Sequence, residues 1–149
     1  MLKIVSGGQT GVDRAALDAA IHLGLECGGY CPKGRKSEDG TISEKYPLTE
    51  TATSDYPERT TLNVKTGDGT LVFIDKQTDP GTSLTISLCK KYFKPYMVID
   101  LSREKEKPEV LQWIKRNKIN ILNIAGNRES TSPGIGKKTF EFLMHLLKA

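Results

Sequence analysis

Apolar residues in this chain occur either in short continuous runs or at helical spacing, and the two patterns alternate. The runs at 2–5, 69–75, 96–101 and 120–125 are continuous, which is typical of strands buried on both faces of a parallel sheet. Between them, the segments 13–23, 56–65, 83–93, 108–117 and 136–148 read as helices. This alternation predicts an α/β fold: a Rossmann-like three-layer α/β/α sandwich with a mainly parallel central sheet, formed as one domain over 1–149.

Two regions fit this pattern less well. A weaker strand is predicted over 25–31, after Gly24 ends the first helix. The polar segment 32–53 shows no clear period, and a connection of that length inside a compact domain usually carries function or mobility.

The first strand leads directly into a glycine-rich loop and a helix. Such a loop turns backbone N–H groups and the positive end of the helix dipole toward an anion, so it favours a phosphate-bearing ligand. The alternative is a tight turn that merely needs glycine. Asp13 either satisfies the helix dipole or bonds a sugar or pterin ring. Neither the Walker spacing nor the dinucleotide fingerprint is present. The candidate loop residues are Gly7, Gly8, Gln9, Thr10 and Gly11.

Loops after the other strands supply further candidates, because ligands of open parallel sheets bind beyond the carboxyl ends of the strands. Thr82 and Ser83 follow the strand that ends at Asp75. After the last strand, Arg128 could pair bidentately with a phosphate, or could simply pair with Glu129. In the same loop, Ser132 and Pro133 suit the N-cap and first position of the last helix. The candidates in this loop are Gly126, Arg128, Glu129 and Ser130.

The polar segment adds both basic and acidic residues. Lys33 and Arg35 could close over an acidic ligand, although a solvated surface is the competing interpretation. Glu38 and Asp39 would repel a phosphate unless they are turned away from it.

Composition narrows the function classes. The chain has 149 residues, 37% hydrophobic and 27% charged, with a net charge of +4, which suits a soluble globular protein. Aromatic residues are few and are not interleaved with basic ones, so nucleic-acid binding is not favoured. No apolar run approaches the length of a membrane span, and the N-terminal strand leaves no room for a signal peptide. The three cysteines read as reduced thiols, so we predict a cytoplasmic protein.

No catalytic residue and no metal ligand is assigned. The spacing of Cys27 and Cys31 lacks the further ligands of a zinc site, and no nucleophile triad is recognisable. Binding is therefore favoured over catalysis.

Several motifs occur in order along nearly the whole chain: residues 6–15, 32–35, 38–40, 46–51, Arg59-Thr60-x-x-Asn63-Val64, 68–70 and Ala125-Gly126-x-Arg128-Glu129-Ser130. Together these motifs resemble the molybdenum carrier (molybdenum cofactor carrier protein-like) family. That family resembles a wider Rossmann-like group of nucleotide-ligand binders, which includes lysine-decarboxylase-like cytokinin-activating hydrolases and DNA-processing A proteins.

The resemblance implies binding of molybdenum cofactor, a phosphorylated pterin dithiolene, and its delivery to molybdoenzyme acceptors. It also implies that residues 7–11 and 128–130 line the ligand groove, with Lys33 and Arg35 nearby. The family pattern has proline where this chain has Asn127, which we expect to loosen that turn.

Two alternatives stay open. One is a sensor or hydrolase acting on a phosphate-bearing nucleotide, with Arg128 and Glu129 as its charge-stabilising and acid–base pair. The Pro-Gly-Gly-x-Gly-Thr-x-x-Glu signature of the cytokinin-activating hydrolases is absent. The other is an interaction module in which the glycine loop is only structural. By analogy with related folds, we also expect a homo-oligomer.

Overall fold

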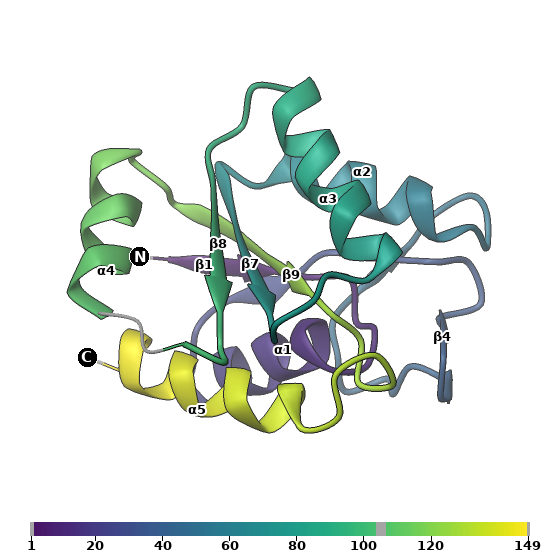
Figure 1. The fold of residues 1–149 in the computed structure, drawn as a ribbon. Helices are drawn as coiled ribbons and strands as arrows, with labels where there is room; N and C mark the ends of the chain where they lie inside the picture. The colour runs from purple at the N-terminus through teal and green to yellow at the C-terminus, as the bar shows by residue number, and fades with distance from the viewer. Residues whose placement is uncertain (1, 104–106, 149) are drawn as a thin grey trace.

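A five-stranded parallel sheet lies at the centre of the computed structural model, which describes residues 2–103 and 107–148 (Figure 1). Every pairing between neighbouring strands in this sheet is parallel. The predicted mainly parallel sheet is therefore confirmed. In spatial order the strands are β2 (Cys27–Gly28), β1 (Lys3–Val5), β9 (Ile121–Gly126), β7 (Gly69–Ile74) and β8 (Tyr96–Asp100).

Helices cover both faces of the sheet and complete the predicted three layers. Side chains of α1, α4 and α5 pack with the strands into the main core on one face. Val64 of α2 packs with Leu88 and Cys89 of α3 on the other. In Figure 1, α1 and α5 lie below the sheet, and α2 and α3 lie above it. The helices are α1 (Val12–Leu23), α2 (Tyr56–Thr66), α3 (Pro80–Lys91), α4 (Lys107–Arg116) and α5 (Ile135–Leu147). None of the helices in the described ranges is long and apolar enough to cross a membrane.

Burial on both faces explains the continuous apolar runs. In β7, Leu71 and Phe73 belong to the main core on one face, Val72 points to the opposite face, and all three are completely buried. Removing such apolar surface from water is the main favourable term in folding, at roughly 25 cal/mol per Å². The central strands therefore had the clearest signal in the sequence.

The order of the strands positions the ligand site. After β1 the chain moves to β2 at one edge, whereas β7 leads to β8 at the other edge, and β9 returns between β1 and β7. The loops that follow β1, β9 and β7 therefore lie next to each other. Ligands of such sheets bind in a crevice where the strand order reverses.

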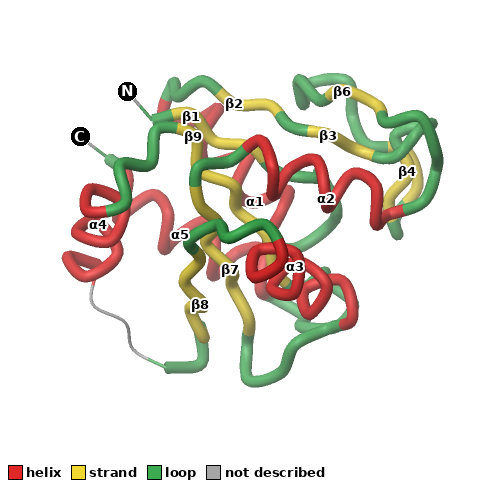
Figure 2. Tube along the Cα trace, turned by 90° about the horizontal axis from the view of Figure 1, so that it is seen from above, coloured by secondary structure: helices red, strands yellow, loops and turns green. Residues whose placement is uncertain are grey.

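Several predicted details differ from the structure. The polar segment 32–53, which shows no clear period, contains three short strands, and the strand predicted over 25–31 is split in two. Helix α3 begins at Pro80, behind the N-cap Asp79, and α5 begins at Ile135, behind Gly134 rather than Ser132. Figure 2 shows β3, β4 and β6 gathered at one end of the molecule. The short strands are β3 (Tyr30–Cys31) with β6 (Thr49–Glu50), and β4 (Lys36–Ser37) with β5 (Gly40–Thr41).

Candidate functional site

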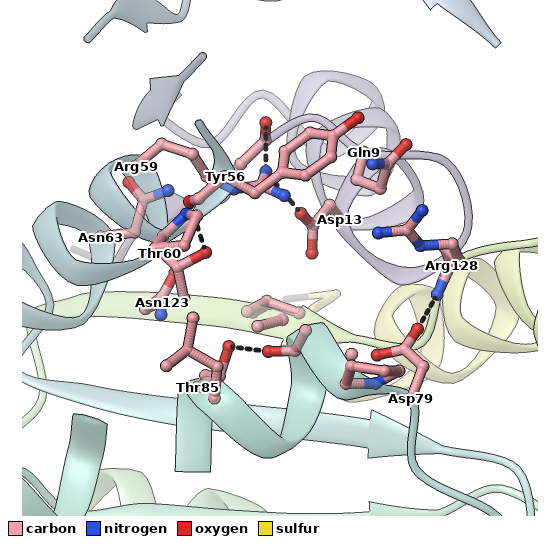
Figure 3. A pocket seen from close by; sticks show the side chains of 18 residues that line it. Gln9, Asp13, Tyr56, Arg59, Thr60, Asn63, Asp79, Thr85, Asn123 and Arg128 are labelled. Carbon is pink, nitrogen blue, oxygen red and sulfur yellow. Dashed lines mark hydrogen bonds and ion pairs between the residues drawn. The ribbon is translucent and has the colours of Figure 1, made fainter. Parts of the chain in front are cut away.

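A pocket of about 290 Å³ lies at the carboxyl ends of β1 and β9, between α2 and α3 (Figure 3). Its walls come from segments that are far apart in the sequence. Apolar atoms form most of the accessible surface of the pocket, although many of the lining side chains carry a polar group. The lining residues are Gly7, Gln9, Asp13, Tyr56, Pro57, Arg59, Thr60, Asn63, Asp79, Pro80, Gly81, Leu84, Thr85, Asn123, Ile124, Ala125, Gly126 and Arg128.

A buried ion pair joins the glycine loop to α2. Arg59 Nη1 lies 3.4 Å from Asp13 Oδ2 and donates a hydrogen bond to the Gly7 carbonyl at 2.9 Å. A Cβ atom on Gly7 would lie 2.0 Å from Arg59 Nη1, so only glycine allows this approach. Burial raises the pKa of Asp13 to about 6, although the charge of Arg59 acts in the opposite direction. Ionisation of Asp13 in this buried position therefore costs more free energy than it would in water.

Polar atoms without protein partners also face this region. Gln9 Oε1 accepts hydrogen bonds from the N–H groups of Thr10 and Glu38, which fixes the orientation of the amide. Gln9 Nε2 and Arg59 Nε are buried and donate to no other described residue. Unsatisfied buried donors are costly and rare in folded proteins, so each of these two groups is a donor that a bound ligand or an ordered water can satisfy.

Cationic side chains surround an aromatic ring beside the pocket. The guanidinium carbons of Arg59 and Arg128 lie 5.1 Å and 5.6 Å from the centre of the Tyr56 ring. Lys36 Nζ lies 4.7 Å from the same centre. Figure 3 shows the Arg128 side chain entering the pocket across from Asn63 and Thr60. Three cationic groups thus lie beside this side of the pocket, with Arg59 paired to Asp13 and Arg128 Nη1 3.8 Å from Glu38 Oε1.

Asp79 connects two of the loops that meet here. Its Oδ1 accepts from the Thr82 N–H at 2.8 Å, which caps α3, and its Oδ2 accepts from the Arg128 N–H at 2.9 Å. Sequence reasoning missed this residue, although Asp79-Pro80 is an N-cap followed by proline at the first helical position. It also assigned no role to Tyr56, Arg59, Asn63, Thr85 or Asn123. Arg59 and Asn63 stood in a quoted motif, but nothing local showed that α2 faces the glycine loop.

The structure brings only part of the candidate set to the pocket. Gly7, Gln9, Asp13, Gly126 and Arg128 line it. The remaining candidates lie outside the lining: Gly8, Thr10, Gly11, Lys33, Arg35, Thr82, Ser83, Glu129 and Ser130.

Two loop glycines are required by packing rather than by the pocket. A Cβ on Gly8 would meet the side chains of Leu48 and Ile42, and Gly8 has a φ of +80°. A Cβ on Gly11 would lie 2.5 Å from the Asn127 carbonyl oxygen, at a φ of +81°. Here the glycines allow the loop to pack closely against its neighbours.

Two predicted cations have other positions. Arg35 is buried, and its guanidinium donates to the carbonyls of Ile42, Ser43 and Tyr46. The prediction that it closes over a ligand is therefore wrong in this structure, since its hydrogen bonds hold the loop. Lys33 is exposed and does not line the pocket.

Three further candidates lie at helix ends or on the surface rather than in the pocket: Thr82, Ser83 and Glu129. Thr82 is buried with its backbone N–H on Asp79, and Ser83 is exposed. Glu129 accepts from the N–H groups of Gly134 and Gly136 at the start of α5. Its carboxylate is thereby committed to a helix N-terminus, where a negative charge is stabilising.

Thr10 and Ser130 contact Glu38 instead of the pocket. The Thr10 hydroxyl donates to Glu38 Oε2, and the Ser130 hydroxyl donates to Glu38 Oε1. The carboxylate is therefore not turned away from the candidate phosphate-binding residues, because it accepts hydrogen bonds from two of them.

Asn127 tightens its turn, contrary to the expectation. Its Oδ1 accepts from the Asp79 N–H, and its Nδ2 donates to the Gln77 carbonyl and to Ser132 Oγ. Its backbone N–H also donates to the Phe73 carbonyl, a bond that proline could not make.

A Rossmann-like sheet with a pocket at its strand ends is the arrangement in which open α/β proteins commonly hold small ligands. The chain belongs to the circularly permutated YpsA SLOG family (cpYpsA), whose model matches residues 4–147. It is similar to a crystal structure of a protein from Syntrophus aciditrophicus SB named "putative molybdenum carrier protein". The two are 42% identical, with a TM-score of 0.94 over 99% of this chain and 95% of the other. These findings confirm the family resemblance. No curated protein sequence matches significantly.

Proposed function

We propose that this protein binds and carries molybdenum cofactor, with the pterin in the pocket between α2 and α3. The name of the Syntrophus protein supports a molybdenum carrier role for its relatives. The observation that carries the proposal is the pairing of a buried carboxylate, Asp13, with a buried and unpartnered amide donor, Gln9 Nε2. A pterin edge presents N–H donors beside a carbonyl, which is the pattern that such a pair can bind.

The remaining walls suit a flat, anionic heterocycle. Leu84, Ile124 and Pro57 offer apolar surface for the faces of a ring. Arg128 offers a guanidinium, whose planar donors match phosphate geometry. The proposal includes delivery to a molybdoenzyme acceptor and self-association, both of which remain predictions.

The geometry favours carriage over hydrolysis at Glu129. An acid–base role needs a carboxylate within reach of the bound ligand, whereas Glu129 caps α5. If the ligand proves to be a nucleotide, Asp13 is the carboxylate whose role in hydrolysis should be tested.

Native mass spectrometry of the protein purified anaerobically from a molybdenum-replete host tests the identity of the cargo. An adduct with the mass of the pterin cofactor, with or without molybdenum, is the expected result. A nucleotide-mass adduct would contradict the molybdenum assignment and support the sensor or hydrolase alternative.

A matched pair of ring compounds tests the role of Asp13. Pterin and lumazine differ at position 2, where pterin has an amino group and lumazine an oxygen. A hydrogen bond to a charged group contributes about 1.5–3 kcal/mol, so we expect pterin to bind about tenfold or more tightly. Asp13→Asn should weaken pterin binding and reduce this preference. Asp18→Asn, on the same helix but outside the pocket, is the control. Equal titration curves for pterin and lumazine would refute the assignment.

A further inference from the structure

The carboxylate of Glu38 lies among hydrogen-bond donors that come from distant parts of the chain. It accepts from the Thr10 hydroxyl, from the Ser130 hydroxyl at 2.5 Å and from the Ser130 N–H at 3.2 Å. Arg128 Nη1 lies 3.8 Å away, and the Glu38 side chain is only 20% exposed. One acidic side chain thus collects hydroxyl, amide and guanidinium donors.

These donors are the kind that bind a phosphate monoester. Hydroxyls, a backbone N–H and an arginine are the groups that proteins use for phosphate oxygens. Burial alone would raise the pKa of Glu38, but the hydrogen bonds from Ser130 and Thr10 and the charge of Arg128 lower it below its usual value. The cluster therefore stabilises an anion at neutral pH.

We infer that Thr10, Arg128 and Ser130 form the subsite for the phosphate monoester of the ligand, and that Glu38 occupies this subsite until the ligand arrives. The inference rests on the proposed function for the molecule that bears the phosphate. The subsite adjoins the pocket, because Arg128 contacts Glu38 and also lines the pocket.

The position of Glu38 in the fold allows it to leave. It lies in the turn between β4 and β5, two-residue strands that pair only with each other. Lys36, Gly40 and Thr41 are exposed, so displacing the turn uncovers little apolar core. The turn is otherwise held by Arg14, which forms an ion pair with Asp39 at 2.6 Å and donates to the buried Ser37 hydroxyl at 3.3 Å, and by the Glu38 N–H, which donates to Gln9 Oε1 at 2.9 Å.

The hydrogen bond from the Glu38 N–H to Gln9 Oε1 links this subsite to the pocket. Gln9 lines the pocket and is oriented by its bond to the Glu38 backbone. Moving the turn would release the amide of Gln9 at the same moment as it vacates the subsite. Entry of the phosphate and adjustment of the pocket are therefore one event.

Titration with inorganic phosphate tests this inference without any pterin. Glu38→Gln removes the competing charge, so we expect it to bind phosphate on the order of tenfold more tightly than wild type. Glu44→Gln, in the same segment and exposed, is the matched control and should behave as wild type. Phosphate affinity in Glu38→Gln equal to or weaker than that of wild type would overturn the inference.

A double variant locates the effect. Glu38→Gln with Arg128→Gln should lose the gain in affinity, and a gain that persists would place the phosphate elsewhere and overturn the inference. If Glu38→Gln fails to fold, Glu38→Asp keeps the charge on a side chain one methylene shorter, and it should also bind phosphate more tightly. Because the probe carries no ring, failure of the pterin proposal would leave these results unaffected, and their failure would leave that proposal standing.

Discussion

At the scale of single residues, Arg35 shows how a cation can serve the fold instead of a ligand. It is only 8% exposed, and its donors are taken by backbone carbonyls of the segment that follows it. Those carbonyls belong to a loop with no sheet partners of its own at 42–46. The guanidinium therefore supplies the hydrogen bonds that regular structure would otherwise provide.

Replacing Arg35 should cost stability rather than ligand affinity alone. We expect Arg35→Met to lower the free energy of unfolding by about 2–4 kcal/mol, because several buried carbonyls lose a charged donor. Lys33→Met, two residues away and exposed, should have little effect. Urea denaturation of the two variants measures the difference. Unchanged unfolding of Arg35→Met together with lost phosphate binding would restore Arg35 to the ligand site.

At the scale of elements, the carboxylate of Glu129 caps the start of α5, and the sequence pattern did not predict this cap. Ser132 was the expected N-cap, but its hydroxyl accepts from Asn127 Nδ2, and the helix starts later, behind Gly134. Glu129 accepts from the first free N–H groups of the helix instead. Capping from a residue outside the helix leaves no local signature, so only the fold shows it.

A variant of Glu129 can distinguish its capping role at α5 from the acid–base role that the hydrolase alternative gives it. Loss of a helix cap typically costs about 1 kcal/mol, so Glu129→Gln should lower the free energy of unfolding by about that amount. Its pterin affinity should match that of wild type. Denaturation and fluorescence titration of one preparation check both expectations. A variant with wild-type stability that can no longer bind or process a ligand would contradict the capping role.

At the scale of the whole molecule, the predictable features were those set by nearby residues. The continuous apolar runs at 69–75 and 120–125 correctly predicted the buried strands β7 and β9, and Gly24 correctly predicted the end of α1. The loops at the strand ends gave five of the eighteen pocket residues, including Gln9, Asp13 and Arg128. Most of the others come from α2 and α3, and which side of each helix faces the pocket depends on packing against the sheet. Arg59 meets Asp13 across 46 positions of sequence, a distance that no local pattern spans.

The pH dependence of stability also belongs to the whole molecule, and Asp13 has a distinct part in it. The pKa of Asp13 is about 6, against an ordinary value of 3.8, because burial disfavours its charged form. The folded protein therefore holds this proton more tightly than the unfolded chain does. The contribution of Asp13 is most favourable below pH 4, falls as the pH rises toward 6, and stays constant above that.

Asp39 and Asp100 act in the opposite sense. Hydrogen bonds to Asp39 from Arg14, and to Asp100 from Ser102, lower the pKa of each carboxyl to about 2. Their stabilisation is present above pH 4 and is lost as the pH falls toward 2. A pH profile of wild type alone would mix these effects, whereas comparison with a variant isolates one group.

Asp13→Asn should accordingly be more stable than wild type at pH 7.5, and the difference should shrink toward pH 4, where the folded wild type is protonated at Asp13. Melting temperatures of both proteins across this range measure it. A variant less stable than wild type at pH 7.5 would show that the pairing with Arg59 outweighs the cost of burial. The expected result bears on function, because destabilising groups are common at functional sites, where activity is retained at a cost in stability. A bound ring that donates to Asp13 would recover that cost, so binding of pterin should raise the melting temperature of wild type more than that of the variant.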